Sequence, residues 1–556
     1  NELYAVQINE DYCLPWGERL YDAYEVKRAD KEVKLKDLDA HDRRCFEHAM
    51  KKEWDTNVRN RAVRLLSFEE GRRVRQRKGH RIMRSRYVHT FKPFNIEEEM
   101  AKELILQATL NGESCIAKSR WVCRGDNDPD ALRVESTSPV LSRDCFMFAL
   151  QLIASHRWRL HFADFSQAFM QGGELERDEE LYCELPPDGV PGIPPGSLVQ
   201  ILKCIYGLTD APFRWNKHLD REFKLLGYKP SVLDPCLYLL HVNGKLEGVI
   251  GLATDDLVDG GSSIHREKLE QLRNKYKFGK WSFDRGRFCG KDLQQSSDFS
   301  IKVDQEYYTE GKCNNYIHVP RGAANEDLAS PDMIAQLRTN NGVLSWIAKE
   351  TRIDLAGGVC MSQQCFPDPT IADIKLSNKL LREARDFKDL AITVQSIDPD
   401  KLCMTATSDA AWGNVRSKGD GEESLASQAG YIVMAAHRDL LDGHLAQITP
   451  LAWRSHTLKR KAASTLRTQV KELAREKGCA INSANAAYRK LDGALESLAA
   501  EPPPLGALQP LHPDLGVGVA DHGRVHLSLH ERLPLLLRQR IHVDRRRRLL
   551  RLRHRR

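Results

Sequence analysis

The sequence predicts an α+β protein made of several domains. At 556 residues the chain is too long for one ordinary hydrophobic core, so roughly three to four domains are expected. From about residue 118, short apolar runs typical of strands alternate with longer segments of helical periodicity. Strand-like segments return at Leu402 after a largely helical stretch, as expected for a further, smaller α/β domain.

The first 94 residues are charge-dense and contain one helical stretch, "RCFEHAMKKEWDTNV". A basic cluster at residues 71–85 is either a phosphate-binding surface or a solvated face. After residue 118, "DCFMFALQLIASH" predicts a buried helix and "WRLHFADF" a strand.

A strand over "SLVQILKC" and a helix over "APFRWNKHLDREFKLLG", closed by Gly227, are expected next. "GVIGLATDDLVDGG" predicts a hairpin, and Ser262 is expected to cap the helix that follows it. On that helix Leu269, Leu272 and Tyr276 share one face. Helices are expected over residues 310–400, followed by strands at "LCMTATSDAAW", "AGYIVMAA" and "PLAWRS".

The net charge of +7 comes from the end of the chain. Residues 501–556 contain 12 Arg and no Lys against five Asp and Glu, so the preceding residues are net neutral and bulk charge does not indicate nucleic-acid binding. The 14 Cys form no C-x-x-C pair, as in a reduced intracellular protein. No secretion signal or run of ~18 apolar residues is visible, and without a starting Met the chain is expected to be part of something longer.

Two adjacent carboxylates, Asp255 and Asp256, follow an apolar strand. A solvated turn would explain such a pair, but a hairpin apex can also aim both side chains at one divalent cation. Asp164 ends another apolar strand, where it is either an ordinary strand-end carboxylate or a third ligand. Three such carboxylates would suit a two-metal phosphoryl-transfer site.

An ordered set of motifs resembles the reverse transcriptase of copia-type LTR retrotransposon Pol polyproteins. The set is "KSRWVCRG" (118–125), "STSPV" (136–140), "DFSQAF" (164–169), "CIYGLTDAPFRW" (204–215), "DPCLY" (234–238) and "TDDLVDGG" (254–261). Weaker similarity continues through "FCGKDL" (288–293) and "TRIDLAGGV" (351–359), and "SDAAWG" (408–413) resembles the start of an attached RNase H domain.

The resemblance implies roles for particular residues. Asp164, Asp255 and Asp256 would be the catalytic triad that binds two Mg²⁺ or Mn²⁺ ions. Phe169 would be the steric gate against a ribose 2′-OH, although a core aromatic is the other interpretation. Lys118 and Arg120 would bind the nucleotide triphosphate; otherwise they are solvated cations.

It also implies a right-handed polymerase with fingers, palm and thumb, an antiparallel palm sheet and a truncated RNase H-like α/β domain. The expected boundaries are a lead-in at 1–94, fingers and palm at 95–310, thumb or connection at 311–400, a partial RNase H-like domain at 401–466, and an aberrant, disordered Arg-rich tail at 467–556.

Three departures from the family pattern stand out. Ala253 and Thr254 replace the usual Tyr and Val before the two aspartates, and Thr209-Asp210 replaces Lys-Gln. A carboxylate at Asp210 should disfavour a triphosphate unless it turns away. In the RNase H segment Asp409 resembles the first carboxylate, but the next expected Glu is missing.

We therefore expect no RNase H activity and a change of reading frame, or a mis-splice, near Leu466. The expected function is RNA-directed DNA polymerase, with an RNA or DNA template–primer, dNTPs and other Pol or Gag products as partners and no membrane. A catalytically dead relic that keeps the fold is the main alternative, and another two-metal enzyme such as a nuclease is the second. No protease D-S/T-G motif or integrase zinc signature is visible, and localisation would be intracellular, in cytoplasmic virus-like particles or the nucleus.

Overall fold

The structure is a computed structural model that describes residues 32–93, 107–110, 113–419 and 422–458. The chain divides into two units, residues 1–473 and 474–556, and all described residues belong to the first. The expected tail at 467–556 lies outside the described residues. Each helix in the described part is too short or too polar to cross a membrane.

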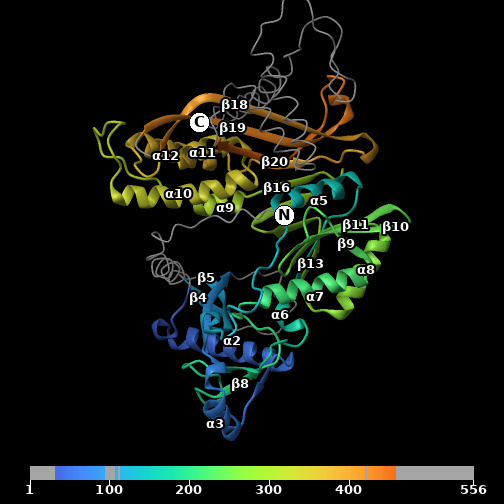
Figure 1. The fold of residues 1–556 in the computed structure, drawn as a ribbon, viewed down its shortest axis with the longest axis vertical. Coiled ribbons are helices and arrows are strands. Elements are labelled where there is room, and N and C mark those ends of the chain that lie inside the picture. Colours follow the sequence, from blue (N-terminus) through green and yellow to red (C-terminus); the bar gives the residue numbers. More distant parts are fainter. Residues whose placement is uncertain (1–31, 94–106, 111–112, 420–421, 459–556) are drawn as a thin grey trace, which may run out of the picture. The chain divides into compact units, whose positions relative to one another are not determined.

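A six-stranded antiparallel sheet in the order β13-β6-β12-β11-β10-β9 lies at the centre of this unit (Figure 1). Every neighbouring pair in it is antiparallel. The strands are β6 (His161–Phe165), β9 (Tyr228–Pro230), β10 (Leu237–Val242), β11 (Lys245–Ala253), β12 (Asp256–Gly261) and β13 (Phe278–Phe283). The α+β organisation and the hairpin predicted from the sequence are confirmed.

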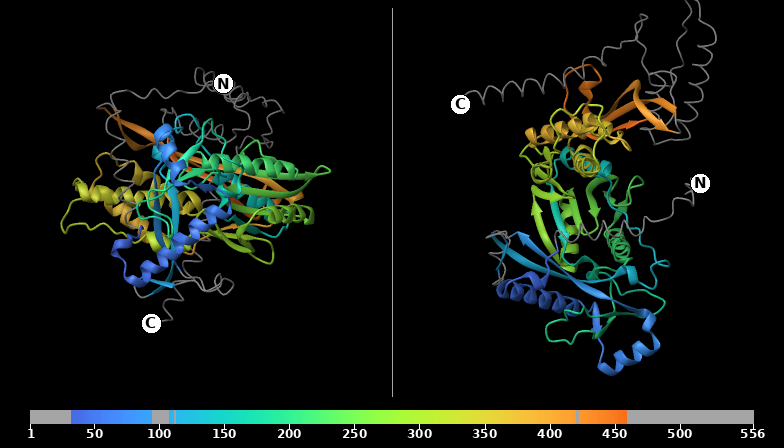
Figure 2. Two further views of the ribbon diagram at one scale, coloured as in Figure 1. Left: turned by 90° about the horizontal axis from the view of Figure 1, so that it is seen from below. Right: turned by 90° about the vertical axis from the view of Figure 1, so that its left-hand side faces the viewer.

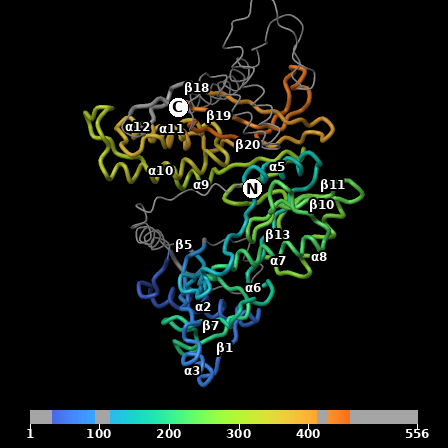
Figure 3. Tube along the Cα trace, in the orientation of Figure 1, coloured from blue at the N-terminus to red at the C-terminus, as the bar shows by residue number. Residues whose placement is uncertain are grey.

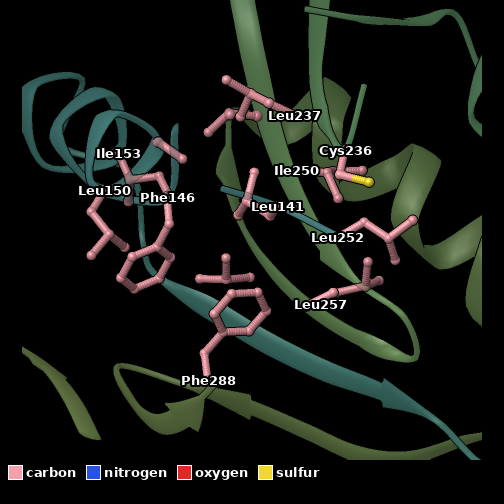
Figure 4. Close-up of a cluster of buried hydrophobic side chains, with 14 of the residues drawn as sticks. Leu141, Phe146, Leu150, Ile153, Cys236, Leu237, Ile250, Leu252, Leu257 and Phe288 are labelled. Atoms are coloured by element: carbon pink, nitrogen blue, oxygen red, sulfur yellow. The ribbon is translucent and has the colours of Figure 1, made fainter. Parts of the chain in front are cut away.

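Three helices share one apolar core with this sheet: α5 (Arg143–Ser155), α7 (Ala211–Leu225) and α8 (Ser263–Lys275). Figure 4 shows Phe146, Leu150 and Ile153 of α5 facing strand residues and Phe288. Complete burial of such side chains stabilises the fold by about 1.5–3 kcal/mol each.

The residue after the end of α7 and the residue before the start of α8 are those predicted from the sequence. Gly227, just beyond α7, has a φ of +93°, the left-handed conformation that ends many helices and the role predicted for it. Ser262 stands at the N-cap of α8 as predicted, but its hydroxyl makes no capping hydrogen bond. Leu269, Leu272 and Tyr276 are all buried, as the helical periodicity predicts.

Two sheets are built mainly from the N-terminal part. Helix α2 (Ala40–Arg59) packs on the sheet β3-β5-β4, as Figure 2 shows. Strands β1, β8, β7 and β2 form one sheet in that order, and β1 and β7 lie close together in Figure 3. The remaining elements here are β1 (Val63–Leu65), α3 (Phe68–Arg77), β2 (Ile82–Met83), β3 (Ser85–Pro93), β4 (Gln107–Leu110), β5 (Glu113–Cys123), α6 (Ala168–Gln171), β7 (Leu181–Glu184) and β8 (Leu198–Ile201).

Gly207 allows strand β5 to approach the loop before α7. Its φ is +94°, and a Cβ atom there would lie 1.9 Å from the carbonyl oxygen of Cys123. The Cys123 amide donates a 2.9 Å hydrogen bond to the carbonyl of Tyr206 next to it. Only glycine fits this contact.

The C-terminal part contains a four-stranded sheet, β14-β15-β16-β17, a group of helices, and a three-stranded sheet, β18-β19-β20. Its elements are β14 (Arg285–Phe288), β15 (Lys291–Gln295), β16 (Ile301–Asp304), α9 (Glu306–Lys312), α10 (Pro331–Glu350), α11 (Ala356–Gln363), α12 (Ile371–Asp386), β17 (Ile392–Val394), β18 (Leu402–Gly419), β19 (Glu422–His437) and β20 (Ile448–Thr457). The wholly helical expectation for 310–400 is wrong at β17, because its β-branched residues pair with β16.

A buried ion network joins the loop after β5 to α7. The guanidinium of Arg177 lies 2.9 Å from the Asp128 carboxylate, 3.2 Å from Asp130 and 2.8 Å from Asp210. The side chains of Arg177 and Asp210 are only 3% and 1% exposed. A buried cation that balances several carboxylates cannot be removed without leaving uncompensated charge.

We therefore expect Arg177→Met to lower the free energy of unfolding by about 3–5 kcal/mol, measured by urea denaturation. Lys224→Met, which breaks an exposed pair with Asp220, is the matched control and should change stability by less than about 1 kcal/mol. Equal effects of the two substitutions would contradict a structural role for the network.

Candidate active site

The three candidate carboxylates meet at the end of the β11–β12 hairpin. Ala253 pairs with Asp256, so Thr254 and Asp255 form a two-residue turn. On its other side β12 pairs with β6, and Asp256 stands directly opposite Asp164. Directly opposed residues of neighbouring strands project to the same face of a sheet. The structure thus brings together the residues that the sequence placed 91 positions apart.

Two hydrogen bonds hold the turn in place. The amide of Phe165 donates to the carbonyl of Asp255 at 2.9 Å, and the indole Nε1 of Trp215 donates to the carbonyl of Thr254 at 2.9 Å. Thr254 has a φ of +58°, which a β-branched residue rarely adopts. Trp215 on α7 therefore supports a strained turn at the candidate site, a role that its sequence motif did not reveal.

Each negative charge in this cluster makes ionisation of the neighbouring carboxyl groups less favourable. Burial, with a smaller contribution from the charge of Asp164, raises the pKa of Asp255. Burial and the charges of Asp255 and Asp164 raise the pKa of Asp256 to about 6. None of the three has an ion-pair partner in the described part of the chain. A cluster of half-buried oxygen ligands without a counter-ion fits a divalent cation, which would favour the ionised forms.

Cations approach this cluster from strand β5. Lys118 and Arg120 are two positions apart and therefore lie on the same face of that strand, and both are exposed. Although Lys118 is exposed, partial desolvation by the surrounding protein and the neighbouring charges of Arg120 and Lys92 lower its pKa, whereas the charges of Glu53 and Asp164 oppose that shift. The positive charges of Lys118 and Arg120 also stabilise ionised Asp255.

Two aromatic rings stand next to these cations. The guanidinium of Arg120 lies 5.1 Å from the ring centre of Tyr206, whose ring meets that of Phe169 edge-on at 5.3 Å. Phe169 is half-buried and packs against two apolar clusters, so it has contacts of a core residue as well. It also lines a cleft of about 550 Å³ together with Trp215.

Two more residues near the carboxylates were not identified from the sequence. Lys280 on β13 stands opposite Asp164, and its charge lowers the pKa of Asp256. A Cβ atom at neighbouring Gly279 would lie 2.8 Å from an Asp164 carboxylate oxygen. No motif indicated either residue, because pairing of β13 with β6 arises only in the folded sheet.

The structure answers the question raised by Asp210. This carboxylate turns into the ion network, where it accepts hydrogen bonds from Arg177 and Arg214. It lines the same cleft as Phe169, but at 1% exposure and paired with two guanidinium groups its charge is compensated there.

Asp409 lies in a different sheet from the three central carboxylates. It is exposed on β18, where its carboxylate accepts a hydrogen bond from the amide of Ala410 at 2.8 Å. It lines a separate cleft of about 360 Å³.

Residues 74–315 match the family described as "Reverse transcriptase (RNA-dependent DNA polymerase)". This segment of the chain is therefore similar to reverse transcriptases. Its resemblance to copia-type retrotransposon Pol polyproteins is confirmed by the curated relatives.

The retrovirus-related Pol polyprotein from transposon RE2 of Arabidopsis thaliana is 24% identical over 64% of this chain and 24% of the polyprotein, so the chain spans about a quarter of that relative. A transposon Ty5-1 protein of Saccharomyces cerevisiae is 22% identical over 51% of the chain and 89% of its own length. Among solved structures, a foamy viral protease-reverse transcriptase in complex with ds DNA has a TM-score of 0.37 at 10% identity, covering 69% of this chain and 57% of that one.

Because ionised Asp256 is unfavourable in the fold, Asp256→Asn should stabilise the metal-free protein. The folded-state pKa of about 6 lies above the ordinary value of 3.8, so the wild type loses stability as the pH rises through this interval. We expect a gain of about 1–2 kcal/mol above pH 7 and none below pH 4, measured by thermal melts in EDTA.

Asp298→Asn is the matched control, because hydrogen bonds from Ser300 lower the pKa of Asp298. That substitution should give no gain at any pH. A loss of stability in Asp256→Asn at pH 8 would contradict the electrostatic interpretation of the carboxylate cluster.

Proposed function

We propose that this protein is an RNA-directed DNA polymerase that extends a primer on an RNA or DNA template with dNTPs. The observation that carries the proposal is the strand register that sets Asp256 opposite Asp164, with Asp255 at the adjoining turn. The match of residues 74–315 to the reverse transcriptase family supports it.

In this proposal Asp164, Asp255 and Asp256 hold two Mg²⁺ or Mn²⁺ ions. When bound, such ions stabilise the attacking and leaving oxygens of an in-line displacement at the α-phosphate. The carboxylates fit this task because they are half-buried oxygen ligands without an ion-pair partner in the described residues.

Lys118 and Arg120 would bind the triphosphate and balance its charge. Both are exposed, both lie on the face of β5 whose charges reach Asp255, and Gly207 fixes that strand against the loop of Tyr206. Phe169 would exclude a ribose 2′-OH, since its ring packs on Tyr206 beneath Arg120. The protein would therefore act chiefly by positioning reactants and by electrostatic stabilisation.

A relic without activity is the second candidate, and one observation favours it. Ala253 occupies the position before the turn where the family has an aromatic residue, and it is 6% exposed. A methyl group there offers little surface on which to seat a primer terminus. The burial of Asp210 weakens a second argument for a relic, whereas the missing Glu of the RNase H segment still counts for it.

Primer extension by the full chain on an RNA template, in Mg²⁺ and in Mn²⁺, separates the two candidates. We expect extension that Asp255→Asn reduces at least about 10³-fold, because the carboxylate cluster is lost while the turn backbone remains. Asp409→Asn is the matched control and should extend primers at the wild-type rate. Absence of extension by a folded wild type that binds template–primer would favour the relic.

Phe169→Val should admit ribonucleotides. Removing the ring lowers the discrimination between dNTP and rNTP by about 10–100-fold, measured as the ratio of kcat/KM values. Lys118→Ala should instead raise the KM of both nucleotides alike. Unchanged discrimination in Phe169→Val would show that the ring is only a core residue.

We also propose that the chain lacks RNase H activity, because the expected Glu after the β18–β20 region is missing. A labelled RNA–DNA hybrid incubated with Mn²⁺ should remain intact. Cleavage abolished by Asp409→Asn would overturn this proposal.

A further inference from the structure

A buried group of side chains joins the three-stranded sheet to the central part of the unit. We name as the junction cluster Arg143 and Phe146 of α5, Lys291 of β15, Glu350 of α10 and Trp453 of β20. Phe146, Lys291, Glu350 and Trp453 are 2%, 3%, 3% and 8% exposed. The side chain of Arg143 is 8% exposed.

Trp453 binds two elements at once. Its ring centre lies 3.3 Å from the guanidinium carbon of Arg143, a stacked cation–π contact. Its indole Nε1 donates a 2.9 Å hydrogen bond to the carbonyl of Ala348 in the last turn of α10. Trp453 also belongs to the apolar core of the central sheet, together with Leu451. Strand β20 is thus fixed to both α5 and α10.

The end of α10 is in turn fixed to the β14–β15 hairpin. Nζ of Lys291 lies 2.7 Å from a carboxylate oxygen of Glu350, and it also lies 4.7 Å from the ring centre of Phe146. Both partners of this pair are buried, so any movement that separates them leaves an unpaired charge in the interior. The pair therefore holds the hairpin at a defined distance from α10.

That hairpin lies beside the candidate carboxylates. Strand β14 packs against β6 and β12, and a Cβ atom at Gly286 would lie 2.6 Å from the ring of Phe162, two residues before Asp164. At the hairpin turn, burial raises the pKa of Cys289 to about 11, and the charges of Asp256 and Asp255 add to that rise. The turn is therefore within electrostatic reach of the site.

We propose that Trp453 is a positioning residue of the polymerase, acting through Ala348 and the Lys291–Glu350 pair on the β14–β15 hairpin beside the carboxylates. The three-stranded sheet, whose sequence resembles the start of an RNase H domain, then serves polymerisation as a brace. The kinetic consequence rests on the proposed function, whereas the effect on the hairpin does not.

The test compares Trp453→Phe and Trp453→Ala in the full chain by hydrogen exchange and primer extension. Phe retains the ring over Arg143 but loses the N–H donor, whereas Ala loses both. Arg454→Ala is the matched control, since Arg454 is the next residue of β20 and is exposed on the opposite face. Because the brace is local, amides of residues 285–295 should exchange about threefold faster in the Phe variant and about tenfold faster in the Ala variant.

Amides of β6 and β12 should retain wild-type exchange in both variants. In primer extension kcat should fall by the same factors while the KM for dNTP stays unchanged, because Lys118 and Arg120 are untouched. Wild-type exchange at 285–295 in Trp453→Ala, or an equal effect of Arg454→Ala, would overturn the inference. If the wild type extends no primer, the proposed function fails, and the exchange data still decide whether Trp453 braces the hairpin.

Discussion

The structure depends on holding three like charges together at one end of a sheet. Asp164 and Asp256 face each other because β12 pairs with β6, and Asp255 follows because the turn to β11 is only two residues long. Repulsion and burial both act against this arrangement. Backbone pairing on both sides of β12, together with the indole of Trp215, supplies the opposing restraint. Such local instability is common at functional sites, where surrounding packing maintains a geometry that the site alone would not adopt.

The positive charges near the carboxylates come from a separate sheet. The position of the strand that carries them depends on a close contact between two backbone segments. Strand β5 carries Lys118 and Arg120 on one face, and its last residue, Cys123, meets Gly207 where no side chain fits. The same loop leads into Asp210, whose carboxylate would oppose a triphosphate if it were exposed. Arg177 draws that carboxylate into the interior. The departure from the family motif is therefore compensated by a buried cation 33 residues earlier in the sequence.

Much of this could be predicted from the sequence, because the informative features were local. Apolar periodicity and turn residues located α5, α7, α8 and the β11–β12 hairpin, and ordered motifs located the three carboxylates. Contacts that form only in the folded chain escaped prediction: Lys280 meets Asp164 through the pairing of β13 with β6, and Arg177 meets Asp210 through an ion pair in the interior. Strand β17 was missed for the same reason, since three residues acquire their strand conformation from pairing with β16.

In the three-stranded sheet, the candidate nuclease residue and the residue that packs against the rest of the unit lie on different strands. Its candidate nuclease residue, Asp409, is exposed, so the fold places little demand on its identity. Trp453, on another strand of the same sheet, is buried between Arg143 and the end of α10, where a smaller side chain would leave a cavity and an unpaired carbonyl. If this sheet belongs to a domain without catalytic groups, as proposed, its strands would still be required wherever neighbouring elements depend on their packing. The contacts of Trp453 with α5 and α10 meet that condition, whereas nothing in the placement of Asp409 does.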